Sequence, residues 1–223
     1  MWEEDDKSKN KKASSIDLSF KIQCECLPLD HAYQLSQAIQ QQLPWFSQDP
    51  LVGLHLLQPP AEGNGWIRPH RGDSVIYLSK RTKLLLRLPE QRQQDGHQLT
   101  DKTLDMGDYQ LKIGVAQVKT LHPTEVLFSH HVLANAGQSE NDFLQEIIQE
   151  LQSHNIHCRK ILFGKSKTFN HPQGQWFTRS LMIADLDPIS ALTLQQQGLG
   201  QGRTMGFGLF QPHKGIKAVG SEE

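Results

Sequence analysis

The chain has 223 residues, of which 37% are hydrophobic and 21% are charged, and its formal net charge at pH 7 is −1. This length allows one large or two small domains with a buried core, and the composition is that of an ordinary soluble protein. No run of about 18 apolar residues exists, and the three cysteines form no C-x-x-C pair, so we expect neither a membrane span nor a zinc knuckle.

Both ends of the chain are expected to be tails. Residues 1–15 are rich in charged side chains and contain no apolar segment of the kind found in secretory signals. We therefore expect a disordered tail there, a second short tail at 217–223, and a cytoplasmic protein. No histidine, cysteine or carboxylate spacing matches a metal site, so neither a metal nor a cofactor is expected.

The first half of the chain predicts one layer of strands covered by helices. Residues 16–27 alternate apolar and polar side chains, which is typical of a half-buried strand. Residues 31–43 repeat apolar side chains at helical spacing before Pro44, which predicts a helix. The further elements expected in this half are strands at 51–57, 74–79 and 83–88, a polar and weakly helical stretch at 90–104, and a closing strand at 109–118.

The second half repeats the same order of elements. Asp187 and Pro188 are a capping residue and a first helical residue, and they begin a helix that runs to Gln197. The other elements expected here are strands at 126–133, 158–163, 177–183 and 205–210 and an amphipathic helix at 141–151. Both halves read β-α-β-β-α-β, so we predict an α+β fold of tandem ferredoxin-like (RRM-like) domains, with antiparallel sheets and helices on one face. The expected domain limits are 16–123 and 124–216.

Glycines fill the connection between the last predicted helix and the last predicted strand; they are Gly198, Gly200, Gly202, Gly206 and Gly208. Glycine adopts backbone angles with positive φ, and such a loop can curl its amide N–H groups around an anion. Arg203 stands within the loop and carries a forked donor suited to phosphate. The order helix, loop, strand differs from both the Walker sequence and the dinucleotide fingerprint. An alternative is a tight turn whose glycines serve packing alone.

This loop reads Gly-x-Gly-x-Gly-Arg-x-x-Gly-Phe-Gly and resembles the glycine-rich loop of the repeat-associated RNA-binding superfamily of CRISPR systems. More narrowly, the chain is similar to the Cas-six family of repeat-processing endoribonucleases, in the short form of the myxococcal subtype. The resemblance covers residues 16–214 and implies the same tandem fold. It also implies that the protein binds the stem-loop of a CRISPR repeat and cuts the precursor RNA at the 3′ base of the stem.

The chemistry that the resemblance implies needs no metal. The ribose 2′-hydroxyl attacks the adjacent phosphate and leaves a 2′,3′-cyclic phosphate and a 5′-hydroxyl. The protein then has to supply only a base, an acid and positive charge. By the same resemblance, the product crRNA stays bound beside a backbone subunit of a type I effector complex.

Histidine suits such a proton transfer, because its unperturbed pKa lies near neutrality. His31 is our first candidate, since it lies in the first turn of the first predicted helix, where the resemblance places the catalytic histidine. A helix N-terminus also favours a phosphate nearby. Tyr33 is expected to hydrogen-bond or stack beside it. The alternative is that His31 only caps or packs there. His55 is expected in the core or on a sheet face, and His130 and His131 on opposite faces of a strand.

Basic residues outnumber acidic residues in two segments, 68–92 and 155–217, although the whole chain is nearly neutral. Such clustering indicates a local face that binds phosphate. In the second segment we expect a loop between the central strands to clamp the backbone of the RNA hairpin. The predicted RNA-binding residues are Lys160, Lys165, Lys167, Arg179, Gly200, Gly202, Arg203, Gly206, Gly208, His213, Lys214, Arg68, Arg71, Lys80 and Arg81.

Two rival functions remain open from the sequence. One is a non-catalytic RNA-binding scaffold of the same superfamily, which would bind the hairpin and yield no product. The other is an unrelated enzyme that uses the glycine loop for a nucleotide, which binding of ATP or NAD would reveal. The complex that the protein joins would degrade DNA or guide another activity, such as transposition.

Overall fold

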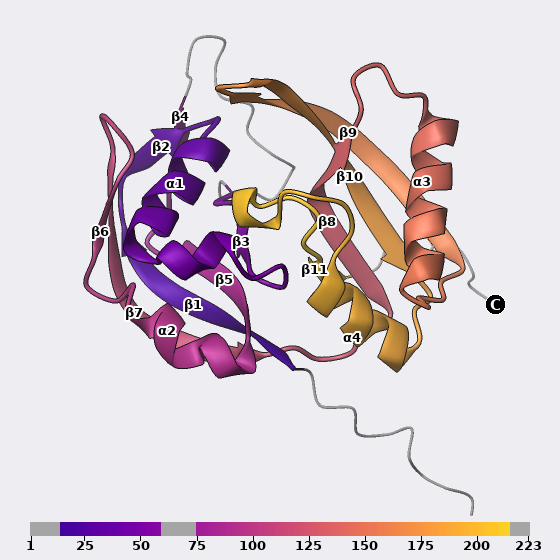
Figure 1. Cartoon of the computed structure of the whole chain (residues 1–223), viewed down its shortest axis with the longest axis horizontal. Coiled ribbons are helices and arrows are strands. Elements are labelled where there is room, and N and C mark those ends of the chain that lie inside the picture. The colour runs from indigo at the N-terminus through magenta and orange to yellow at the C-terminus, as the bar shows by residue number, and fades with distance from the viewer. Residues whose placement is uncertain (1–13, 59–74, 215–223) are drawn as a thin grey trace, which may run out of the picture.

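The computed structural model describes residues 14–58 and 75–214. Its strands form a five-stranded sheet of order β3-β5-β1-β7-β6, a four-stranded sheet of order β11-β8-β10-β9, and a two-stranded ribbon of β2 and β4. Figure 1 shows the first sheet with α1 and α2 on one side of the molecule and the second sheet with α3 on the other. Among the helices in these ranges, none is both long and apolar enough to cross a membrane.

The first sheet contains the ferredoxin-like strand order. β1, β3, β5 and β7 are the strands of that motif, α1 and α2 are its helices, and β6 extends the edge beside β7. The elements are β1 (Ser15–Gln23), α1 (Ala32–Gln42), β3 (Gly53–His55), β5 (Lys83–Pro89), α2 (Gln93–His97), β6 (Thr103–Asp105) and β7 (Gln110–Thr120). Short 3-10 turns at Pro44–Ser47 and Glu90–Arg92 follow α1 and precede α2.

Alternation along β1 decides which face of the first sheet becomes the core. Ile16, Leu18 and Phe20 are buried and belong to one apolar cluster with three leucines of β5 and the inner face of α1. The three leucines are Leu84, Leu86 and Leu88. Burying each such side chain contributes about 1.5–3 kcal/mol. The short helix α2 lies close on this face because residue 96 is a glycine: a Cβ there would overlap the side chains of Leu18 and Leu88.

The alternating segment 16–27 is not one strand. β1 ends at Gln23, and β2 (Cys26–Pro28) pairs with β4 (Val75–Tyr77) in the separate ribbon. β4 and β5 follow each other through the turn at 80–82, as predicted, but they lie in different sheets. A period of two marks a strand and does not identify its partner, so the sequence pattern alone did not separate them.

The second sheet repeats the motif. Its order β11-β8-β10-β9 places the first and third strands in the centre, as in the first sheet. The elements are β8 (Val126–Ala134), α3 (Glu140–Ser153), β9 (Lys160–His171), β10 (Gly174–Ala184), α4 (Pro188–Gln197), a 3-10 turn (Arg203–Met205) and β11 (Gln211–Pro212). Asp187 caps α4 as predicted, accepting hydrogen bonds from the Ile189 and Ser190 amides. The predicted α+β, tandem ferredoxin-like fold is confirmed, and the domain limits at 123 and 124 stay a prediction.

Two predictions for the second half were wrong. The polar connection expected at 164–176 is not a loop, because β9 and β10 continue through it as a paired hairpin whose turn lies at 172–173. Nor is 205–210 a strand. Gly206 and Gly208 have φ of 88° and 68°, values that an extended strand does not contain, so the chain turns there and pairs only at 211–212.

Two buried arginines join the halves of the chain. Arg87 of β5 has no exposed surface; it donates to both carboxylate oxygens of Asp17 at 2.9 Å and to the carbonyls of Gln195 and Phe210 at 2.8 Å. Arg203 reaches in the opposite direction, as its Nη2 donates to the Leu51 carbonyl at 2.8 Å. Each arginine therefore binds backbone carbonyls of the other half, which fixes the position of one sheet against the other.

Candidate functional site

His31 stands at the residue before α1 and turns its ring inward. Its Nδ1 lies 2.9 Å from the Pro28 carbonyl, and it makes no capping hydrogen bond. A carbonyl only accepts, so Nδ1 carries the hydrogen and Nε2 is left with a free lone pair. The residue is 3% exposed, and Nε2 has no hydrogen-bond partner among the described residues. The Nε2 atom of His31 is therefore a buried proton acceptor that makes no hydrogen bond to the described residues.

The surroundings of His31 keep its imidazole neutral. Burial and, to a smaller extent, the positive charge of Lys167 lower the pKa of His31 to about 4, although the Pro28 hydrogen bond and Asp30 act to raise it. A neutral imidazole accepts a proton at pH 7. Leaving a buried acceptor unpaired costs about 1–3 kcal/mol. This cost marks Nε2 as a candidate functional atom.

Strand β9 crosses the start of α1 beside this histidine. The Asn170 amide donates to Asp30 Oδ2 at 2.6 Å, and the His171 ring meets Tyr33 edge-on at 4.8 Å. Residues 167, 169 and 171 share one face of the strand, because side chains alternate. Phe169 on that face is buried with the first core. The face that carries Lys167 is therefore turned towards α1.

Lys167 is the cation of this region. Its Nζ lies 4.6 Å from the centre of the Phe169 ring, a cation–π contact, and burial lowers its pKa. Its charge also lowers the pKa of His31, His130 and His131. Lys167 was expected in a loop that clamps RNA; it lies instead on a strand, half-buried and beside the candidate base.

His131 is a residue that sequence reasoning set aside. It is 7% exposed, its Nδ1 lies 3.3 Å from Thr178 Oγ1, and its Nε2 is buried without a partner in the described chain. Burial, with the charge of Lys167, lowers its pKa to about 2. Its ring packs edge-on against Phe169 at 4.9 Å. Adjacent histidines on a strand indicated opposite faces, and nothing in their spacing revealed that one of them lies next to β9.

The glycine loop is placed differently from the prediction. Arg203 is 8% exposed, and its guanidinium donates to the carbonyls of Leu51, Val52 and Gln197. Its forked donor is therefore engaged inside the protein and does not face a phosphate. A Cβ at 206 would overlap Leu56 and one at 208 the Leu199 carbonyl, so these glycines serve close packing. The packing alternative describes the loop better than the anion-binding one.

The other predicted RNA contacts are scattered. Arg179 is turned to α3, donating to the Gln138 carbonyl at 2.8 Å, and Lys160 pairs with Asp185 at 3.3 Å. Lys165 is exposed on β9, as are Lys80 and Arg81 in the turn before β5 and His213 and Lys214 after β11. Gly200 is exposed and donates its amide to Glu150. Arg68 and Arg71 lie outside the described residues.

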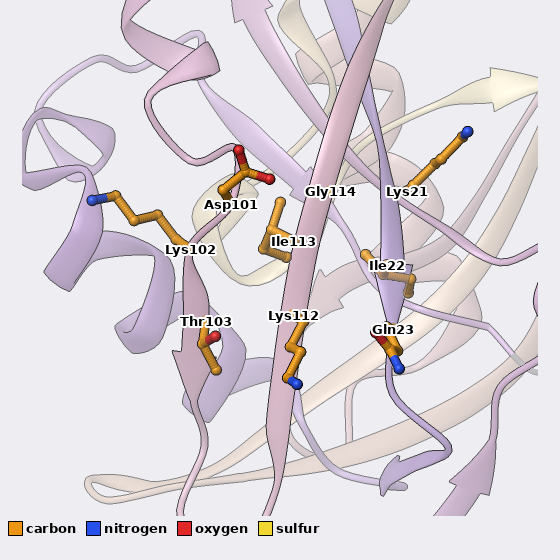
Figure 2. A pocket seen from close by; sticks show the side chains of 9 residues that line it. All are labelled: Lys21, Ile22, Gln23, Asp101, Lys102, Thr103, Lys112, Ile113 and Gly114. Carbon is orange, nitrogen blue, oxygen red and sulfur yellow. The ribbon is translucent and has the colours of Figure 1, made fainter.

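A pocket of about 410 Å³ lies apart from His31, where the ends of β1 and β7 meet residues 101–103. It is lined by Lys21, Ile22, Gln23, Asp101, Lys102, Thr103, Lys112, Ile113 and Gly114. Figure 2 shows its lysine side chains pointing away from one another, with the Asp101 carboxylate between the backbones that carry them. These charges do not converge on one anion. We therefore place the candidate chemistry at His31.

No set of three or more His, Cys, Asp or Glu side chains within 14–58 and 75–214 is arranged to hold a metal ion. The groups that cluster at β9 and α1 are instead proton acceptors and a cation. This set can take up a proton and stabilise negative charge.

Comparison with known proteins gives a consistent result. Residues 16–215 match the model of the family described as Cas6 Crispr. The chain is 25% identical over 197 residues to the CRISPR-associated endonuclease Cas6 of Myxococcus xanthus (strain DK1622), covering 88% of this chain and 81% of that protein. A solved structure described as CRISPR associated protein Cas6 has a TM-score of 0.62 and 13% identity, over 90% of this chain and 100% of that one. Another, described as an RAMP protein binding different RNA substrates, has a TM-score of 0.54 and 11% identity, over 88% of this chain and 98% of that one.

Proposed function

Since the chain belongs to the Cas6 family of CRISPR proteins, we propose that it is an endoribonuclease that binds the stem-loop of a CRISPR repeat and cuts precursor RNA at the 3′ base of the stem. The relative in Myxococcus xanthus is named an endonuclease, and a similar fold is described as binding RNA. The single observation that carries the proposal is the buried, unpaired Nε2 of His31. Lys167 supports it as the adjacent cation.

In the proposed reaction, His31 Nε2 takes the proton of a ribose 2′-hydroxyl. The 2′-oxygen forms a bond to the adjacent phosphorus while the bond from phosphorus to the 5′-oxygen breaks. The departing oxygen takes up a proton, from the imidazolium of His31 or from water. The products are a 2′,3′-cyclic phosphate and a 5′-hydroxyl, so no proton or electron is gained or lost overall. Lys167 offsets the added negative charge on the phosphate in the transition state.

Phosphate binding would also tune the base. A pKa of about 4 makes the free imidazole a weak base. An anion within a few ångströms favours the protonated form and moves this pKa back towards neutrality, where general-base catalysis is most effective. Because His31 is 3% exposed, RNA reaches its ring only if the surrounding structure opens. Strand β9, which contacts the start of α1 through Asn170 and His171, is the neighbouring element that would have to move.

The same burial favours a second candidate function, a non-catalytic scaffold that holds the hairpin within a CRISPR ribonucleoprotein. A histidine that never meets RNA would serve only packing. In either case the bound RNA would pass into a type I effector complex next to a backbone subunit. We further propose that the halves at 16–123 and 124–216 are separate domains of this RNA-binding protein.

The test incubates the full chain with repeat RNA in EDTA and maps the product ends. The proposal predicts one cut at the 3′ base of the stem, with a cyclic phosphate on the upstream product. RNA with a 2′-deoxyribose at the cleavage position should bind equally and stay intact. Tight binding of the unmodified RNA with no product at any time would support the scaffold, and cleavage only in the presence of a divalent ion would overturn the proposed chemistry.

A further inference from the structure

The open face of the second sheet carries a row of apolar side chains. α3 and α4 cover the opposite face, where their side chains share a buried cluster with Leu127, Leu181 and Ile183. Strand register places Leu162, Met182 and Phe128 opposite one another across β9, β10 and β8, and Gln211 of β11 completes the row. Leu162 is 49% exposed, and Phe128 and Met182 are half-buried. The row therefore faces away from the helices and in part towards solvent.

Two imidazole rings flank the aromatic member of this row. His130 lies two residues after Phe128 on the same strand, and their ring centres are 4.8 Å apart. The ring of His213 lies 5.4 Å from Phe128. The backbone fixes His213 there, because its amide donates to the Val126 carbonyl just after β11 pairs with β8. Both histidines are exposed. Three rings thus gather on β8 and just past the end of its neighbour β11.

The charges around these rings are positive. Partial burial of the ring lowers the pKa of His130 to about 4, and the positive charge of Lys167 acts in the same direction. Lys214 follows His213 and is exposed. In the next row of the sheet, Lys160 is already paired with Asp185. A ligand for this face therefore has a flat ring and carries negative charge.

We propose that Phe128, with His130 and His213, forms a stacking platform for an unpaired nucleobase of RNA. Antiparallel four-stranded sheets with exposed rings stack bases in this way, and the nearby cations favour the attached phosphates. Bases within a stem are already stacked and paired, so the platform takes a base from the single strand that flanks the stem-loop. This inference rests on the proposed RNA-binding function, and it adds a contact separate from His31.

The experiment compares two RNAs by fluorescence anisotropy with the full chain. One is the stem-loop alone, and the other carries its single-stranded flanks; both contain 2′-deoxyribose at the cleavage position. Wild type should bind the flanked RNA more tightly. Phe128→Leu should lose about 5- to 150-fold of the affinity for the flanked RNA, the range for one stacked base, and leave binding of the stem-loop unchanged. Phe128→Trp should retain the tighter binding.

The matched control is Ile189→Ala, since Ile189 is 47% exposed on α4 at the helical face and should bind both RNAs like wild type. Thermal melting of each variant verifies folding. A 2-aminopurine placed in the flank should be quenched by wild type and much less by Phe128→Leu. Equal affinity of wild type for the two RNAs, or an equal loss for both RNAs in Phe128→Leu, would overturn the platform. Failure of wild type to bind either RNA would instead overturn the proposed function.

Discussion

Removing the Arg87 side chain should destabilise the protein more than any exposed substitution. Arg87→Ala leaves the Asp17 carboxylate buried without its bidentate partner and leaves the carbonyls of Gln195 and Phe210 without their donor. Although burial alone would raise it, Arg87 and His55 hold the pKa of Asp17 below its usual range. Removing one partner of a buried ion pair lowers the free energy of unfolding by about 3–5 kcal/mol. For a chain of this size, this loss lowers Tm by about 6–20 °C.

Chemical denaturation of Arg87→Met, Asp17→Asn and the double variant measures the coupling directly. The double variant should be more stable than Arg87→Met, because it no longer buries an unpaired charge. Lys160→Ala is the matched control: its ion pair with Asp185 is exposed, so its removal should leave the Tm almost unchanged. Asp17 and Arg87 are register partners within the first sheet, so strictly additive effects in the cycle would refute their coupling. A loss below about 1 kcal/mol in Arg87→Met would refute the role of Arg87 in joining the two sheets.

Three further predictions concern the site and the glycine loop. Lys167→Ala should slow single-turnover cleavage by about 10- to 1,000-fold with nearly unchanged RNA affinity, and Lys165→Ala on the same strand should not; equal slowing in both would remove the special role of Lys167. Folding lowers the pKa of His31 from 6.5 to about 4, so the unfolded chain binds the proton more readily than the folded one. The free energy of unfolding should therefore decrease as pH falls from about 6.5 to 4, and urea titrations of His31→Gln should show a weaker dependence on pH. An unchanged pH dependence in this variant would contradict the assignment. Gly208→Ala should destabilise by more than the roughly 1–2 kcal/mol expected of Gly137→Ala, because both have φ near 70° but only a side chain at 208 meets the Leu199 carbonyl; equal losses would show that packing there is loose.

The sequence predicted what depends on local pattern. Apolar spacing placed α1 and α3, and the capping residue Asp187 with Pro188 at the first helical position placed the start of α4. Alternation located β1, and the strands expected at 83–88 and 126–133 match β5 and β8 within a residue or two. These patterns arise within one helix or strand, so they can be recognised without knowing which other elements it packs against. The repeated order of elements was then enough to predict the tandem ferredoxin-like fold.

What the sequence missed depends on contacts between distant residues. The polar segment 164–176 has no strong strand pattern, yet it pairs along β10 and packs Phe169 into the first core. The placement of Arg203 among three carbonyls is a similar case, because the residues near Arg203 in the sequence do not indicate a hydrogen bond to the Leu51 carbonyl. His131 entered the candidate region only because β9 passes beside it. Long-range packing, and not local propensity, sets each of these positions.

The central claim is that Nε2 of His31 accepts the proton in RNA cleavage, and the most direct measurement is the single-turnover cleavage rate of His31→Ala in EDTA at saturating enzyme. We expect a loss of about 100- to 10,000-fold with RNA affinity retained. His122→Ala is the control, because His122 is exposed and its ring hydrogen-bonds to the nearby Thr120 hydroxyl; it should cut like wild type. Cleavage at the wild-type rate by correctly folded His31→Ala would contradict the account, and the unpaired nitrogen of His131 would be the next to test.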